Sequence, residues 1–158
     1  MTLPTPLVAA RGLTKKFGDF TAVSGINFSI EKGESFGFLG PNGAGKTSTM
    51  KMVSSVSAPT AGSIDIFGLN TVSFGPEIRS RIGVVPQDDT LELELSVLDN
   101  LMMFGRYFDL PRAVIKERAT ELLDFAQLTE KRDEAVDKLS GGMKRRLTIA
   151  RSLINRPE

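Results

Sequence analysis

Eight consecutive residues in the first third of the chain have the pattern of a phosphate-binding loop. They are Gly40, Pro41, Asn42, Gly43, Ala44, Gly45, Lys46 and Thr47. This run matches G-x-x-x-x-G-K-[ST] at every fixed position. Glycine tolerates positive φ and has no side chain that would keep a phosphate from the backbone, so the N–H groups of the loop are free to point inward. The run therefore predicts a nucleotide-binding site.

The last residues of this loop and those that follow it supply charge and a metal ligand. We expect Lys46 to reach the β- and γ-phosphates and Thr47 to offer its hydroxyl to Mg²⁺, a hard cation that prefers oxygen. A helix predicted over Lys46–Ser54 adds positive potential at its N-terminus. The predicted ATP contacts from this segment are Gly40, Pro41, Asn42, Gly43, Ala44, Gly45, Lys46, Thr47 and Ser48.

A second pair of glycines lies far downstream, in Leu139-Ser140-Gly141-Gly142-Met143. Ser140 is a good N-cap, and the glycines leave the N–H groups of the first turn uncovered. An apolar face follows at Leu147, Ala150, Leu153 and Ile154. An ordinary capped amphipathic helix explains this run when it is taken alone. Together with the loop at Gly40, it indicates a second helix start suited to phosphate.

The composition limits the class of protein. With 158 residues and 41% hydrophobic content, the chain can bury one core, so one domain or part of one is expected. The net charge of +1 argues against a surface for polyanions. The chain has no cysteine or histidine, which excludes disulfides and thiolate metal sites and favours a reducing compartment. No apolar run approaches the roughly 20 residues of a membrane helix, and the N-terminus does not resemble a secretion signal.

Three regions of the chain must position these motifs. The first is a sheet region with one helix, and its predicted strands are Ile26–Ile30, Ser35–Leu39, Ser63–Phe67 and Ile82–Val85. The second is helical. Its first predicted helix has Ser96 as the N-cap, followed by an apolar stripe of Val97, Leu98, Leu101, Met102 and Phe104. Pro111 is expected at the start of a second helix, whose core face is Val114, Ile115, Leu122, Leu123 and Phe125. The third opens at Ser140.

Two further features accompany these motifs. Gln87 follows Val84-Val85-Pro86, and Lys144-Arg145-Arg146-Leu147 follows LSGGM. Together they resemble the nucleotide-binding subunit of ATP-binding-cassette (ABC) transporters over essentially the whole chain. The resemblance implies an α/β P-loop NTPase core with an N-terminal antiparallel β subdomain and an inserted helical subdomain. It divides an incomplete domain, residues 1–158, into a β subdomain and P-loop core (1–87), a helical subdomain (88–139) and a signature helix (140–158).

The variant Met143, where the family usually has glutamine, is similar to a subgroup that exports drugs, polysaccharides and lipids. Within it, residues 104–108 and 147–151 look closest to the nodulation-factor export ATPases.

The resemblance also implies roles for individual residues. Phe17 falls where the family stacks an aromatic ring on adenine, although a simple core phenylalanine is the alternative. Gln87 matches the glutamine that approaches Mg²⁺ and the attacking water, so Lys46 and Gln87 are the catalytic residues and Thr47 and Gln87 the metal contacts. An exposed loop glutamine is the alternative. The residues expected to contact the γ-phosphate held by the other subunit of a head-to-tail dimer are Ser140, Gly141 and Gly142.

In the family, an aspartate for Mg²⁺, a glutamate that polarises water and a later histidine lie beyond the position of Glu158. Phosphoryl transfer depends on positioning the metal and the water as well as on holding phosphate. We therefore expect the complete protein to be an ABC-type ATPase. The 158 residues alone, which lack the C-terminal part of the core, are expected neither to hydrolyse ATP well nor to fold fully.

The function implied is that of the energy-coupling subunit of a membrane exporter, with ATP and Mg²⁺ as cofactors. Its expected partners are a second copy, in an ATP-driven dimer, and a transmembrane permease. Direct nucleic-acid binding is not expected, and the location would be peripheral, on the cytoplasmic face of the membrane. The alternative is a soluble ABC-type ATPase that acts on nucleic acid or ribosomes, against which the near-neutral charge and the single cassette argue.

Other acidic residues offer rival assignments. Asp88-Asp89 follow an apolar run and could pass for the metal aspartate of another P-loop class, but Pro86 and Gln87 displace them from its end. Asp65-Ile66-Phe67-Gly68 mimics the D-x-x-G of GTPases, but no Asn-Lys-x-Asp guanine reader follows. Solvated loop acids and a turn after a strand are the simpler explanations. A GTPase or a small-molecule kinase is the third class of function.

Overall fold

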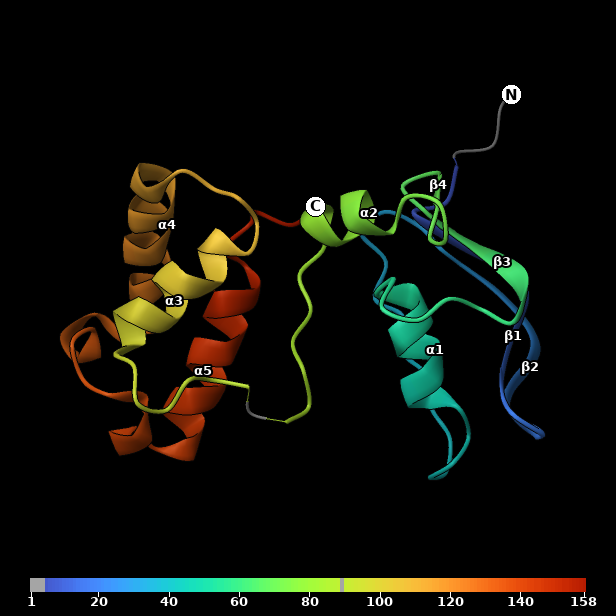
Figure 1. Ribbon diagram of the computed structural model, residues 1–158, viewed down its shortest axis with the longest axis horizontal. Helices are drawn as coiled ribbons and strands as arrows, with labels where there is room; N and C mark the ends of the chain where they lie inside the picture. The colour runs from blue at the N-terminus through green and yellow to red at the C-terminus, as the bar shows by residue number, and fades with distance from the viewer. Residues whose placement is uncertain (1–4, 89) are drawn as a thin grey trace. The chain divides into compact units, whose positions relative to one another are not determined.

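The chain forms two units, each with its own buried residues. The computed structural model describes residues 5–88 and 90–158, and the units span residues 1–79 and 80–158. Figure 1 labels their helices and strands. Across both described stretches, every helix falls short of the length and apolar character that crossing a bilayer demands.

An antiparallel sheet forms the first unit. Its strands follow the order β2 (Phe20–Ile30), β1 (Val8–Phe17), β3 (Ala61–Ile66) and β4 (Leu69–Asn70). A two-residue turn joins β1 to β2, so that Phe17 is paired with Phe20. The strands predicted over Ile26–Ile30 and Ser63–Phe67 are confirmed as parts of β2 and β3, with β3 ending one residue early.

Side chains at alternate positions of the sheet are buried. On β1 these are Val8 and Ala10, and on β3 they are Ile64 and Ile66, as expected when one face of a strand is covered. The helix predicted after the phosphate loop is confirmed as α1 (Lys46–Val53), and α2 (Gly75–Arg81) follows β4. Met52 of α1 is fully buried, whereas Met50 is 49% exposed.

Two predicted strands do not form. Residues 35–39 and 82–85 adopt no strand, and neither run pairs with another segment anywhere in residues 5–88 and 90–158. The prediction was wrong because β-type residues make a strand only when a neighbour completes their backbone hydrogen bonds. Leu39 is 98% exposed, and Val84 and Val85 are also exposed. Aromatic rings of the first run contact β2, with the centroids of Phe36 and Phe38 at 5.6 and 5.2 Å from that of Phe28.

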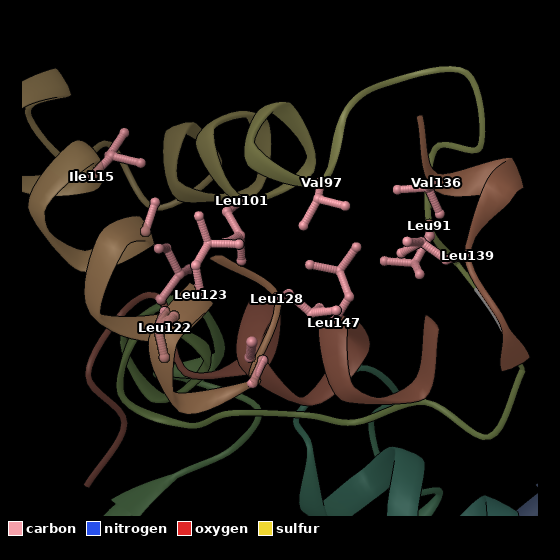
Figure 2. Packing of buried hydrophobic residues seen from close by; sticks show 14 residues of the cluster. Leu91, Val97, Leu101, Ile115, Leu122, Leu123, Leu128, Val136, Leu139 and Leu147 are labelled. Carbon is pink, nitrogen blue, oxygen red and sulfur yellow. The ribbon is translucent and has the colours of Figure 1, made fainter. Parts of the chain in front are cut away.

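The second unit is a set of packed helices. They are α3 (Val97–Arg106), α4 (Arg112–Phe125), the short turns η1 (Thr129–Lys131) and η2 (Val136–Lys138), and α5 (Gly141–Ser152). Figure 2 shows their shared core. The buried members of this core are Leu91, Val97, Leu101, Ile115, Ala119, Leu122, Leu123, Ala126, Leu128, Val136, Leu139, Leu147, Ala150 and Ile154. Residues from both predicted segments, 88–139 and 140–158, thus fill a single core.

The helix starts of this unit agree with the sequence. The Ser96 Oγ accepts a hydrogen bond from the Asp99 N–H at 3.0 Å, and Pro111 occupies the N-cap of α4. Of the predicted core face of α4, Ile115, Leu122 and Leu123 are buried. The assignment was wrong for the two ends of that face, because Val114 is 37% exposed and Phe125 is 65% exposed.

Candidate nucleotide-binding site

The phosphate loop has a backbone that requires glycine. Gly43 and Gly45 have φ values of 84° and 82°, which L side chains rarely adopt. A Cβ on Gly45 would also lie 2.2 Å from the backbone oxygen of Ala22 and 3.1 Å from Cγ2 of Val23. The loop therefore rests directly on β2, at a position where no side chain fits.

The ammonium group of Lys46 lies over the beginning of its own loop. Its Nζ donates to the carbonyl oxygens of Gly40 and Pro41, each at 2.7 Å. An ammonium has three donors, so one is left for an anion. The N-cap of helix α1 is Gly45, which provides no side-chain hydrogen bond, and the first turn has no acidic residue. The Lys46 ammonium and the N–H groups of the first turn thus lie in one short segment. Thr47, which carries a hydroxyl, is exposed in the same segment.

Phe17 lies at the end of the β1–β2 hairpin and is 56% exposed, so the alternative of a core phenylalanine is wrong. The Nζ of Lys15 lies 5.3 Å from the ring centroid and donates to the Ala58 carbonyl at 2.7 Å. The loop before α1 rests on Ala22, close to the same hairpin turn, and Figure 1 shows the turn and the loop toward the same end of the sheet. An exposed ring and a phosphate loop therefore belong to one region of the first unit.

The second glycine motif forms the start of α5. The Ser140 Oγ accepts a hydrogen bond from the Met143 N–H at 3.3 Å, which confirms the predicted N-cap. Gly141 and Gly142 are exposed, and a Cβ on either would meet nothing within 4 Å. A glycine inside a helix destabilises it by about 1 kcal/mol relative to alanine. Contacts among the described residues therefore do not explain why these residues are small. Met143 packs against the core of the second unit.

Gln87 lies in an exposed bend whose two ends are held by arginines of α5. Arg145 Nη1 donates to the Pro86 carbonyl at 2.6 Å, and Arg151 Nη1 donates to the Thr90 carbonyl at 2.7 Å. Sequence reasoning missed both arginines. The basic run after the glycines was visible, but the carbonyls that it reaches are set by the path of the chain, which no motif encodes.

The rival acidic residues have different surroundings. Asp88 is exposed in the same bend, and Asp89 lies outside the described residues. Asp65 belongs to β3, where its Oδ1 accepts a hydrogen bond from Asn70 Nδ2 at 3.3 Å. That contact belongs to the β3–β4 hairpin, in agreement with a turn after a strand.

The predicted site residues thus fall into two groups. The first unit brings together Phe17 and the phosphate loop, Gly40 to Ser48. The second contains both Gln87 and the start of α5 at Ser140, Gly141 and Gly142, and side chains of α5 bind the backbone on either side of Gln87.

Comparison with known proteins decides the family. The pattern that describes the ABC transporter family matches residues 23–158, most of the chain. The chain belongs to this family. A protein of Ralstonia nicotianae named Nod factor export ATP-binding protein I is 49% identical over 154 residues, which cover 98% of this chain and 48% of that protein. A protein of the same name from Rhizobium meliloti is 46% identical, with 98% and 46% covered. The chain spans about half the length of the curated relatives that it matches.

Solved ABC structures have the same fold. The ATP-binding cassette MJ0796, described as a dimer in a post-hydrolysis state with ADP and Pi, gives a TM-score of 0.81 at 28% identity, covering 95% of this chain and 70% of that one. The cbiO1 protein of Clostridium perfringens, described as part of the transporter complex cbiONQ, gives 0.82 at 26% identity, with 96% and 62% covered. The predicted ABC ATPase fold and the resemblance to nodulation-factor export proteins are both confirmed.

Proposed function

We propose that this ABC-family chain binds ATP with Mg²⁺ and couples the nucleotide to export across a membrane, as an ABC-type ATPase. The observation that carries the proposal is the phosphate loop. It combines two glycines at positive φ, an uncapped helix start and a lysine ammonium within eight residues. Such an arrangement suits a polyphosphate because backbone N–H groups, the helix dipole and a cation converge on one point.

The residues present fit the cofactors by their chemistry. The space beside Gly43 holds no atom within 4 Å of where a Cβ would lie, so the loop leaves its backbone open to phosphate there. Lys46 would hold the phosphates, Thr47 would offer a hydroxyl to Mg²⁺, and Phe17 would present its exposed ring to adenine. When bound, Mg²⁺ supplies positive charge that offsets the phosphates. We assign Gln87 to contact Mg²⁺ and the attacking water, as the matching glutamine does in the family.

Ser140, Gly141 and Gly142 are assigned to the nucleotide of a second copy of the chain. Two exposed glycines in the first turn of α5, with no contact in the chain that requires them, suit the close approach of a group from outside. ATP would then join two subunits head to tail. The MJ0796 cassette, which has the same fold, is described as a dimer.

A transmembrane permease is the proposed partner in export. The relatives from Ralstonia nicotianae and Rhizobium meliloti are named for Nod factor export, and cbiO1 is described as part of a transporter complex. Docking on such a permease would place the protein peripherally, on the cytoplasmic face of the membrane. Co-purification with a membrane protein is the expected result. Association with ribosomes in place of a membrane protein would contradict the export function.

The binding proposal is tested by Lys46→Ala. We expect the affinity for a fluorescent ATP analogue to fall at least tenfold, because a charge-assisted contact to phosphate is lost. Lys51→Ala is the matched control, since Lys51 lies in the last turn of the same helix. Equal affinities for wild type and Lys46→Ala would refute the proposal. If GTP displaced the analogue as effectively as ATP does, the result would favour a GTPase.

A further inference from the structure

One helix holds both ends of the bend that carries Gln87. Arg145 reaches the carbonyl on the N-terminal side, at Pro86, and Arg151 reaches the carbonyl on the C-terminal side, at Thr90. Both arginines belong to α5, the helix that Ser140 caps. Carbonyl oxygens that accept from guanidinium groups make stronger hydrogen bonds than neutral pairs do.

The two anchors differ in their surroundings. The Arg145 side is exposed, whereas Arg151 is only 5% exposed. Its guanidinium carbon lies 4.6 Å from the ring centroid of Phe104 on α3, and its Nη2 donates to the hydroxyl of Thr90 as well. A buried arginine with two bonds to one residue and a ring on one face has little freedom to move. Arg151 is therefore the fixed anchor and Arg145 the accessible one.

We propose that Arg145 and Arg151 are positioning residues for Gln87. They fix the bend to α5, so that Gln87 and the helix start at Ser140 keep one geometry and move as one body when nucleotide joins two subunits. This inference rests on the proposed function, because it assigns the arginines a role only through Gln87. Neither arginine is assigned a contact with ATP.

Steady-state kinetics of ATP hydrolysis by the full-length protein test this role. Arg145→Ala should lower kcat for ATP hydrolysis about tenfold, since a displaced catalytic group loses its alignment. The KM and the affinity for a fluorescent ATP analogue should not change. Arg146→Ala is the matched control, because the adjacent Arg146 donates to Gln127 Oε1 and not to the bend. Its kcat should stay within about twofold of wild type.

A double-substitution cycle separates positioning from general structural damage. In a Gln87→Ala background, Arg145→Ala should cause no further loss of kcat, because the group that it positions is already gone. Independent losses would overturn the positioning role while leaving the proposed function intact. A wild-type protein that fails to bind ATP would instead overturn the proposed function. An unchanged kcat in Gln87→Ala would overturn both the role of Gln87 and this inference.

A spectroscopic measurement tests the anchors without catalysis. These 158 residues contain no cysteine, so Gln87→Cys gives one site for a nitroxide label once any cysteine outside them is replaced. Arg145→Ala should increase the mobility of this label, and so should Arg151→Lys, which keeps the charge and loses the paired hydrogen bonds. Arg146→Ala should leave the spectrum unchanged. Identical spectra in all four proteins would show that the arginines do not hold the bend.

Discussion

Two of the helix starts that carry glycine, those of α1 and α5, are built in opposite ways. The N-cap of helix α1 is Gly45, whose φ of 82° and close fit against β2 exclude any side chain. The N-cap of helix α5 is Ser140, which caps the helix with its own hydroxyl, while Gly141 and Gly142 have open space around them. In α1 the fold requires its glycine, whereas in α5 it does not.

This difference suggests how each helix start meets phosphate. An uncapped start with a lysine next to it is ready for a ligand within the same unit. A start that its own serine already caps needs no ligand to be stable. Glycines without a role inside the chain are then explained by a surface that something outside must approach. Three substitutions, taken in order of expected effect, test this contrast.

Gly45→Ala should have the largest effect. Positive φ and the contact with the Ala22 carbonyl are both unfavourable for alanine, so we expect unfolding to become easier by about 3 kcal/mol or more. ATP binding should be lost as well. Urea denaturation and titration with a fluorescent ATP analogue measure the two effects.

Gly43→Ala is the control for this substitution. Its φ is 84°, but a Cβ there would meet nothing within 4 Å. Only the backbone strain of about 1–2 kcal/mol is expected. If the two alanine variants were equally stable, the close fit of Gly45 against β2 would not contribute, and the contrast with α5 would weaken.

Ser140→Ala should have an intermediate effect. The loss of an N-cap lowers stability by about 1 kcal/mol. Binding of ATP to the single subunit should not change, in contrast to Gly45→Ala, because Ser140 is assigned to the nucleotide of the second copy. Ser96→Ala, which removes the corresponding cap of α3, should lower stability similarly and serves as the comparison. A stability equal to wild type would show that the hydroxyl does not cap α5.

Gly141→Ala should have the smallest effect on stability, and it should stabilise the protein where the other substitutions destabilise it. Alanine is the better helix former, so the free energy of unfolding should rise by about 0.5–1 kcal/mol. Dimer formation in the presence of ATP should weaken, as sedimentation would detect, because the added methyl group occupies space needed by the partner's nucleotide. A decrease in stability would mean that the glycine has a role inside the chain.

Motifs and helix ends could be predicted from the sequence because they depend on local chemistry. The phosphate loop, the cap at Ser140, the cap at Ser96 and the start of α4 after Pro111 all follow from residue types at fixed offsets. Long-range packing could not be predicted in this way. Phe125 has the spacing of a core residue but lies at the end of α4, where it is 65% exposed.

The two missing strands illustrate the same limit. Residues 35–39 and 82–85 have β-type composition, but a strand is a property of a pair, and neither run finds a partner in the described parts of the chain. The arginine anchors of the Gln87 bend were missed for a related reason. Their acceptors are carbonyl oxygens about 60 positions away in sequence, and a carbonyl has no signature of its own.

The exposed side chains of Leu39, Val84 and Val85 affect how the chain must be handled. Short exposed apolar runs that lie outside any sheet, as these segments do, are what chaperones and growing aggregates recognise. Hydrophobic dyes should therefore bind the 158-residue polypeptide readily. The polypeptide should stay soluble at low concentration or when it is fused to a solubilising protein. It should aggregate when it is concentrated without such a fusion.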